Sequence, residues 1–386
     1  METMETNREE FVKRALAHEK SKLELCREYG ISRPTGDKWI KRYQETGDLK
    51  EQSRRPFLTA NKIDPKTEEL IIGARKREPA IGALKVRRML INSGWASPPS
   101  ASTINAVFKR NGLITREASE KAQPCVRFAK DEPNDMWQAD FKGNFLLCDN
   151  TRCHPLSVVD DNSRYCLCVD AKLNEQAAGV KESLLRTFNT YGLPKTILCD
   201  NGTPWGSSQT TSITAIEVWL MEYGILTMHI RPKHPQTQGK VERFNGSYKQ
   251  ERLSFYVPRD INDAQKSREE YRCFYNNYRP HHALNLDCPA QHYRVSPRKL
   301  PEKISEWDYE PGAELRSIKS SGYISYDGQG YYLSEGIGKK TVAICPSEID
   351  GVMNIVFREF QIARLDLRER TITSRRVYLL HDDPRQ

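Results

Sequence analysis

The sequence predicts a multidomain protein in which all-α units precede an α/β domain with a mixed sheet and a small C-terminal β-barrel. At 386 residues the chain is longer than one ordinary hydrophobic core supports. Its hydrophobic pattern has the period of helices in the first third, of strands and helices in the middle, and of short strands near the end. We therefore expect helical domains at 7–50 and 66–115, an α/β domain at 134–297 and a barrel at 310–370, joined by linkers at 51–65 and 116–133.

Basic residues are concentrated toward the N-terminal end. Residues 1–130 carry 27 Lys and Arg against 17 Asp and Glu, whereas residues 131–386 carry 33 against 34. Such a basic region indicates a polyanion as partner, although a merely soluble basic surface is the alternative. The N-terminus lacks an apolar signal segment, and no apolar run reaches the roughly 18–20 residues of a membrane helix. We expect a cytoplasmic protein whose ten Cys are mostly reduced and buried.

The first helical domain has the pattern of a helix-turn-helix. Apolar spacing predicts helices over 8–19, 21–30 and 33–44, with Gly30 ending the second and Ser32 capping the third. A basic helix after a Gly-containing turn is typical of helices that enter the major groove of DNA. A plain three-helix bundle is the alternative. In the DNA-binding interpretation the exposed face carries Arg33, Thr35, Lys38 and Lys41.

The second helical domain has the same proportions, with helices expected over 65–78, 82–94 and 100–113. Either Ser100 or Ser102 is expected to cap the last helix. Because the pattern occurs twice in tandem, we interpret it as a DNA-binding arrangement and not as a chance resemblance. The residues expected to contact DNA here and in the preceding linker are Arg54, Arg55, Ser102, Lys109 and Arg110.

The middle of the chain alternates strands and helices. Strands are expected at 135–147 and, on either side of a turn at 161–163, within 154–173. A helix, a buried strand, a second helix and a strand follow at 176–192, 195–200, 212–224 and 225–230, and Val241, Phe244 and Tyr248 are spaced for one face of another helix. This order describes an α/β domain on a mixed sheet. Short β-rich runs with Gly-containing turns over 321–367 predict the small barrel.

Three acids of the α/β domain lie where a site could form. Asp140 lies on the first strand, Asp200 closes a buried strand before a turn, and Glu242 lies on a helix that can pack against the same sheet. Converging carboxylates repel unless a cation lies between them, and Mg²⁺ or Mn²⁺ suits such oxygen ligands. Two ions about 3.5–4 Å apart can activate an attacking oxygen and stabilise the leaving one in phosphoryl transfer. Taken singly, each acid is more often a cap, turn or surface residue.

Five ordered motifs resemble one family. The segments "MWQADF", "VVDDNSRY", "CDNGTPW", "HPQTQGKVERFNGS" and "YNNYRPHHAL", spread over residues 136–284, are similar to the core of bacterial insertion-sequence transposases related to retroviral integrases. This is the DDE superfamily, whose core has a ribonuclease-H-like fold. The second helical domain and the β-rich tail also resemble domains of such transposases, so the resemblance covers most of the chain.

The resemblance implies roles for individual residues. The catalytic, metal-binding triad would be Asp140, Asp200 and Glu242, with two Mg²⁺ or Mn²⁺ ions in each active site. The side chains implied to contact DNA in this domain are His234, Gln236, Gln238, Lys240, Arg243 and Arg279. Lys240 and Arg243 would hold phosphates of the transposon end. For Arg279 a structural role is the alternative.

Two features depart from the retroviral pattern. Forty-one residues separate Asp200 from Glu242, more than in retroviral integrases, although this spacing suits one insertion-sequence branch. The N-terminal His-His-Cys-Cys zinc module is absent from the sequence. Groups that include Cys and His lack zinc spacing and are interpreted as core residues: Cys148, Cys153, His154, Cys166 and Cys168.

Other acids compete with the triad. Asp160 and Asp161 are the main rivals as metal ligands, and we expect a hairpin turn to expose Asp161. Glu251 lies nine residues after Glu242, which places it on the opposite face of a regular helix. The triad therefore stays the leading assignment.

The sequence thus predicts a transposase that binds terminal inverted repeats, hydrolyses DNA to free a 3′-hydroxyl and joins that hydroxyl to target DNA. Its partners would be transposon-end DNA, target DNA and further copies of the chain, as a dimer or larger assembly associated with the bacterial nucleoid. A non-catalytic DNA-binding regulator and a metal-dependent nuclease without strand transfer are the alternatives.

Overall fold

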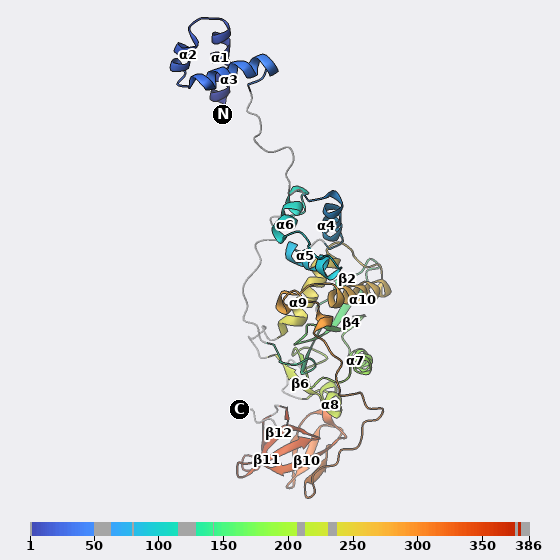
Figure 1. Cartoon of the computed structure of the whole chain (residues 1–386). Helices are drawn as coiled ribbons and strands as arrows, with labels where there is room; N and C mark the ends of the chain where they lie inside the picture. Colours follow the sequence, from blue (N-terminus) through green and yellow to red (C-terminus); the bar gives the residue numbers. More distant parts are fainter. Residues whose placement is uncertain are drawn as a thin grey trace. The chain divides into compact units, whose positions relative to one another are not determined.

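The computed structural model describes residues 2–49, 63–78, 81–114, 129–141, 143–206, 213–230, 238–374 and 377–379 (Figure 1). The chain divides into two compact units, Met1–Asp64 and Pro65–Gln386. Each unit is considered by itself. No helix of the described residues is both long enough and apolar enough to span a membrane.

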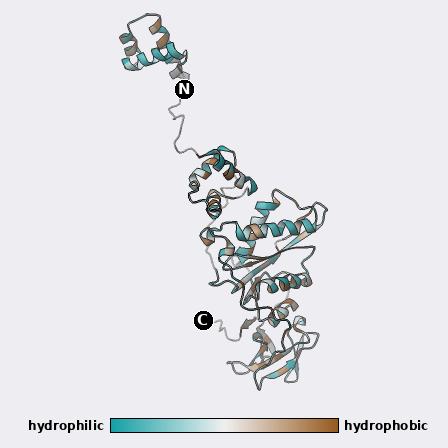
Figure 2. Cartoon of the chain, turned by 45° about the vertical axis from the view of Figure 1, so that its right-hand side comes forward, coloured by the Kyte–Doolittle hydropathy of each residue, from teal (hydrophilic) through white to brown (hydrophobic). Residues whose placement is uncertain are grey.

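The first unit is a group of three helices, as the sequence predicts: α1 Glu2–Leu16, α2 Lys22–Glu28 and α3 Arg33–Thr46. Ser32 caps α3 by accepting a hydrogen bond from the Thr35 N–H. Phe11, Leu25 and Ile40 are buried between the helices, and the hydrophilic residues on their other faces are teal in Figure 2. A Cβ at Gly36 would lie 2.8 Å from the Phe11 ring, so only glycine permits this close approach.

The second group of helices begins the second unit and comprises α4 Pro65–Arg77, α5 Ala83–Asn92 and α6 Ala101–Arg110. Ser100 caps α6 through the Thr103 N–H, which decides between the two Ser candidates. Side-chain hydrogen bonds and ion pairs join this group of helices to the α/β domain. Both carboxylate oxygens of Glu78 accept hydrogen bonds of 2.8 Å from Arg252, and Arg88 pairs with Asp287 at 2.5 Å.

The α/β domain is built on a mixed sheet, which confirms the prediction. Its strands are β1 Met136–Phe141, β2 Phe145–Leu146, β3 Arg152–Asp160, β4 Cys166–Lys172, β5 Thr196–Cys199 and β6 Leu226–His229. The order is β4-β3-β1-β5-β6, with β2 paired to β3. β1, β5 and β6 run parallel to one another, and β3 is antiparallel to both β1 and β4.

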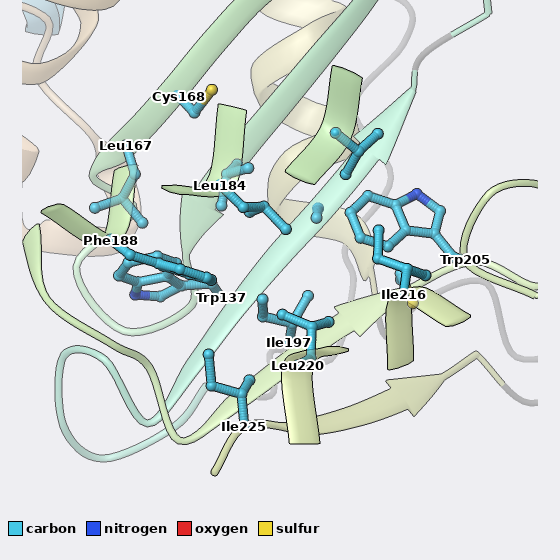
Figure 3. Packing of buried hydrophobic residues seen from close by; sticks show 14 of the residues in the cluster. Trp137, Leu167, Cys168, Leu184, Phe188, Ile197, Trp205, Ile216, Leu220 and Ile225 are labelled. Carbon is cyan, nitrogen blue, oxygen red and sulfur yellow. The ribbon is translucent and has the colours of Figure 1, made fainter. Parts of the chain in front are cut away.

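Helices cover both faces of this sheet. Successive side chains of each strand point to opposite faces, so the strands present residues for burial on both sides. On one face α7 Ala177–Tyr191 and α8 Ala215–Glu222 pack against the sheet, where Trp137, Phe188 and Leu220 are buried together (Figure 3). On the other face α9 Gly239–Tyr248 and α10 Ile261–Asn277 pack on β3 and β4. Val241, Phe244 and Tyr248 face this core together, as predicted.

Two helical segments were not predicted. The π-helix η3, Lys249–Leu253, continues α9. The sequence gives little sign of α10, because it has few aliphatic residues; its buried face is formed by Ala264, Arg268, Tyr271 and Tyr275. Short 3₁₀ turns occur at His282–Leu284, Pro289–Gln291 and Glu335–Ile337.

The C-terminal part is an antiparallel sheet of β7 Glu314–Ser317, β10 Thr341–Pro346, β11 Val352–Phe357, β12 Phe360–Asp366, β13 Thr371–Ser374 and β14 Tyr378–Leu379. Its order is β13-β12-β11-β10-β7, with β14 paired to β12. A hairpin of β8 Tyr323–Tyr326 and β9 Gln329–Tyr332 forms a separate two-stranded sheet. Among the described residues β7 and β13 are not paired with each other, so these strand pairings do not show the closed barrel that the sequence predicts.

Candidate active site

The first candidate acid, Asp140, lies near the end of the central strand β1 and is only 8% exposed. The Asn245 amide of α9 donates a 3.4 Å hydrogen bond to its Oδ2. Asn245 is itself fixed, because its Oδ1 accepts a 2.7 Å hydrogen bond from Ser157 on β3. Asp140 is thus directed toward helix α9.

The second candidate acid, Asp200, directly follows β5, the parallel neighbour of β1. Gln138 pairs with Leu198 in the register of these strands, and continuing both by two residues brings Asp140 opposite Asp200. The carboxyl ends of adjacent parallel strands are where ligands of α/β sheets bind. Asp200 Oδ1 accepts a hydrogen bond of 3.1 Å from Gly202 N–H, which closes the turn.

A histidine holds the backbone of Asp200. His229 Nδ1 lies 2.9 Å from the Asp200 carbonyl oxygen, and His229 Nε2 lies 2.8 Å from Glu217 Oε1. Acceptors on both ring nitrogens favour the doubly protonated imidazolium. Although burial lowers the pKa of His229, its hydrogen bonds to Cys199 and Glu217 raise that pKa to about 11. We did not identify His229 or Glu217 from the sequence, where neither belongs to a motif.

The third candidate acid, Glu242, is half-buried in the first turn of α9. It lies three residues before Asn245, so both side chains lie on the same side of the helix. Because Asn245 contacts Asp140, Glu242 lies one helical turn from that contact. The helix thus brings the third acid to the strand that carries the first.

Carboxylate oxygens from two strand ends and a helix form a donor set that suits a hard divalent cation. In the described part of the chain, however, no group of three or more His, Cys, Asp or Glu side chains is arranged so that it could hold a metal ion. Among the described residues the three acids therefore do not form a ready-made metal site in this conformation.

The surroundings of Lys240 differ from the expectation. Its ammonium lies 2.6 Å from Asp161 Oδ1, and its side chain is 13% exposed. Burial lowers the pKa of Lys240, and the hydrogen bond that Lys240 donates to Asp161 opposes that effect. Lys240 is therefore engaged in an ion pair inside the domain, and its contact with DNA phosphates stays a prediction. Arg243, on the same helix, is exposed.

The rival acids, Asp160 and Asp161, accept hydrogen bonds inside the domain. Asp161 is fully buried, so the prediction that a turn exposes it is wrong; its Oδ2 accepts from Lys130 N–H at 2.8 Å. Asp160 is also fully buried and accepts hydrogen bonds from Asn134 N–H and from Ser163. Burial raises the pKa of Asp160. Because internal donors surround both carboxylates, their role is structural.

Glu251 and Arg279 form a buried ion pair. Arg279 donates to both oxygens of Glu251, at 2.7 and 2.9 Å, and Tyr271 donates to Oε2 at 2.8 Å. Burial raises the pKa of Glu251, and the hydrogen bonds from Arg279 outweigh it and lower that pKa. Arg279 is 8% exposed and is paired with Glu251, which favours the structural alternative, and its contact with DNA stays a prediction.

The expected DNA contacts of the helical groups are mostly exposed. Arg33, Lys38, Lys41, Ser102 and Lys109 are exposed, whereas Thr35 is half-buried and its hydroxyl lies 2.8 Å from that of Ser32. Arg110 is also exposed but donates to Glu68 at 2.7 Å. Gln238 is buried and donates to the Ala139 carbonyl at 2.7 Å, so it supports the sheet. The remaining candidates, Arg54, Arg55, His234 and Gln236, lie outside the described residues.

The Cys and His group of the sheet is mostly structural. Cys153, Cys166 and Cys168 are buried, as predicted for core thiols, and burial raises their pKa values. Cys148 is exposed, so its interpretation as a core thiol is wrong. His154 lies 2.8 Å from Glu175.

Comparison with family models covers most of this architecture. A helix-turn-helix domain matches residues 7–57, an integrase core domain matches residues 130–235 and again 223–289, and the C-terminal domain of IS481 family transposases matches residues 313–373.

Relatives of the chain come from insertion elements. An uncharacterised 39.2 kDa protein of insertion element IS476 from Xanthomonas euvesicatoria is 29% identical over 163 residues, which are 42% of this chain and 45% of that protein. An uncharacterised 31.7 kDa protein of insertion element IS407 from Burkholderia multivorans is 29% identical over 185 residues, 47% and 61% of the two chains. The chain thus spans about half the length of these relatives.

Solved structures resemble the chain more remotely. The catalytic core domain of HTLV-2 integrase in complex with magnesium is 18% identical, with a TM-score of 0.32, over 42% of this chain and 99% of that one. A chain of the simian T-cell lymphotropic virus intasome in complex with PP2A regulatory subunit B56 gamma is 18% identical, with a TM-score of 0.35. The match covers 76% of this chain and 96% of that one.

The mixed sheet with acids at its edge, matched by the integrase core models, defines an integrase-core protein with a helix-turn-helix domain. The chain carries a helix-turn-helix domain, an integrase core domain and a C-terminal domain like that of IS481 family transposases, and its relatives are named as insertion-element proteins.

Proposed function

We propose that this protein is a DNA transposase. It binds the terminal inverted repeats of its element, hydrolyses a phosphodiester to free a 3′-hydroxyl, and joins that hydroxyl to target DNA. The observation that supports the proposal is the placement of Asp140 and Asp200 at the ends of adjacent strands, with Glu242 on a helix bonded to the first of them, within an integrase core.

Asp140, Asp200 and Glu242 would hold divalent metal, Mg²⁺ or Mn²⁺, with two ions in each site. Bound metal would supply charge stabilisation for phosphoryl transfer and a more acidic bound water. Since the described acids do not yet form a three-ligand cluster, the proposal implies that they close around the ion when it binds. The residues that orient them are Asn245 for Asp140, and Gly202 with His229 for Asp200.

DNA recognition would fall to the helical groups, whose exposed basic residues include Arg33, Lys38 and Lys109. In the core, Arg243 is the exposed base beside Glu242 and would contact the phosphates of the transposon end. Two ends must be joined, so we propose a homodimer or larger assembly on DNA, associated with the nucleoid. A closed C-terminal barrel and the domain limits predicted above belong to the same proposal.

The test of activity combines purified protein, Mg²⁺ and oligonucleotides with the ends of the element. We expect cleavage and joining, both abolished in Asp140→Asn and in Glu242→Gln. Glu270→Gln, an exposed Glu on α10, is the matched control and should retain activity. Strand joining by either triad variant would disprove the assignment. Cleavage without joining would favour a nuclease, and binding without either reaction would favour a regulator.

The test of recognition is the salt dependence of binding to end DNA. Each phosphate contact contributes about 0.9 to the slope of log K against log salt on duplex DNA. We expect Arg33→Ala and Lys38→Ala each to lower the slope by about one contact. A slope unchanged in both variants would argue against the helix-turn-helix as the reader of DNA.

A further inference from the structure

Helix α9 begins without a capping side chain of its own. Its N-cap residue, Gln238, makes no side-chain hydrogen bond to the first turn. The N–H groups at the start of any helix lack partners within the helix. Here Gln138 Oε1 on β1 accepts from both Lys240 N–H, at 3.1 Å, and Val241 N–H, at 3.2 Å. A strand residue about one hundred positions earlier in the chain therefore caps the helix that carries Glu242.

The amide nitrogen of Gln138 is hydrogen-bonded as well. Its Nε2 donates to Asp161 Oδ1 at 2.7 Å, and the same oxygen pairs with Lys240 Nζ at 2.6 Å. Gln138 and Asp161 are fully buried. The amide of Gln138 thus has one orientation that fits, with oxygen toward two N–H donors and nitrogen toward a carboxylate. The three side chains close a ring of contacts between β1, the turn after β3, and α9.

Two further contacts tie the same helix to the same strand. Gln238 donates to the Ala139 carbonyl at 2.7 Å, and Asn245 donates to Asp140 at 3.4 Å. Contacts at positions 238, 240, 241 and 245 lie on either side of Glu242. The position of Glu242 relative to Asp140 therefore depends on this ring.

We propose that Gln138, Asp161 and Lys240 are positioning residues that set the register of α9 against β1 and so hold Glu242 opposite Asp140. The inference rests on the proposed function, which makes these two acids partners in catalysis. It also changes the role of Lys240. Of the two bases that flank Glu242, Arg243 contacts DNA and Lys240 positions the acid.

The first experiment compares Lys240→Met with Arg243→Met in the full chain. Lys240→Met should lower the rate of strand transfer about 100-fold, which is the effect of a displacement of roughly 1 Å in a catalytic group. Its affinity for end DNA and its salt slope should stay within twofold of the wild type. Arg243→Met should weaken DNA binding and lower the slope by about 0.9, the share of one phosphate. A loss of slope in Lys240→Met equal to that in Arg243→Met would overturn the proposal.

The second experiment asks whether the three residues act as a unit. Lys240→Met leaves Asp161 as a buried charge without its cation. Adding Asp161→Asn should therefore raise the rate of strand transfer at least tenfold above that of Lys240→Met alone. Gln138→Glu should be as inactive as Gln138→Leu, because its second oxygen would face Asp161. Independent, additive losses in the double variant would contradict a shared positioning role.

Hydrogen exchange provides a readout that does not need activity. In Gln138→Leu the amides of Lys240 and Val241 should exchange at least tenfold faster, while those of α7 stay within twofold. If the wild type neither cleaves nor joins DNA, the proposed function fails, and the exchange rates and salt slopes still decide whether Gln138 and Lys240 fix α9. Unchanged exchange at both amides would overturn the positioning role even in an active enzyme.

Discussion

Two sets of acidic side chains of the integrase core differ in their surroundings. Asp161 and Glu251 are buried, and each faces a cation of the chain itself, Lys240 and Arg279 respectively. Asp140 and Asp200 lie at the ends of adjacent parallel strands and accept hydrogen bonds from an amide and a backbone N–H. Folding compensates the charge of the first set, whereas the second set lies at the strand ends where the proposed function places divalent metal. Replacing an acid should therefore cost stability in one set and activity in the other.

The largest effect is expected for Asp200→Asn. Loss of a metal-binding carboxylate should lower strand transfer at least about a thousandfold, or roughly 4 kcal/mol in the activation barrier. The midpoint of urea unfolding should not fall, because Asp200 has no ion pair within the part of the chain that the structure describes. Strand-transfer rates and urea unfolding of the same preparations measure both quantities. A variant that loses stability and keeps activity would reverse the comparison.

The next effect is expected for Glu251→Gln. This change leaves the Arg279 guanidinium buried without its countercharge, which should lower the free energy of unfolding by about 3 kcal/mol. Urea unfolding measures it, with Glu270→Gln as the exposed control. The folded fraction should keep its rate of strand transfer. A stability equal to that of the wild type would show that the buried pair contributes nothing, and the two sets of acids would no longer differ.

A smaller effect is expected for Glu78→Gln. Glu78 joins the end of α4 to Arg252 in the π-helix η3 through two hydrogen bonds. Hydrogen bonds to charged groups contribute about 1.5–3 kcal/mol, so we expect a loss of about 2 kcal/mol on urea unfolding of the full chain. Lys76→Gln, an exposed position on the same helix, is the control. Equal unfolding curves would mean that this pair does not hold the helical group to the core.

The smallest effect concerns a buried base. His281 is 8% exposed, and its Nε2 has no hydrogen-bond partner among the described residues. Burial, with the nearby Arg279 and Lys85 charges, lowers its pKa from 6.5 to about 2. The unfolded chain then takes up a proton below pH 6.5 that the folded chain does not, so stability is present above that pH and is lost as the pH falls.

The expected slope is up to about 1.4 kcal/mol per pH unit below that point. Urea unfolding at pH 7 and pH 5 should show a smaller decrease for His281→Asn than for the wild type. Other groups titrate alike in both proteins, so the difference isolates His281. Parallel decreases would show that His281 is already protonated in the folded protein.

The order of helices and strands as far as β6 could be predicted from the sequence, because apolar residues recur every three to four positions in helices and every second position in strands. The sequence also allowed Asp140 to be placed on the first strand and Asp200 at the end of a buried strand. It could not show that Lys240 faces Asp161 or that Arg279 faces Glu251, since these partners are 79 and 28 positions apart and only the fold brings them together. Helix α10 was missed because its inward face uses Tyr and Arg where aliphatic residues would have given a periodic signal.

The contact between the C-terminal sheet and α8 has a consequence for the exchange of domains during evolution. Ser334 donates to the Ile213 carbonyl, Lys340 pairs with Glu222, and Gly336 packs against the backbone of Ile213 and Thr214 so closely that no larger residue fits. A C-terminal domain taken from a related transposase would have to match this surface. Since Glu217 of the same helix holds His229 against Asp200, a poorly matched graft would disturb catalysis as well as attachment.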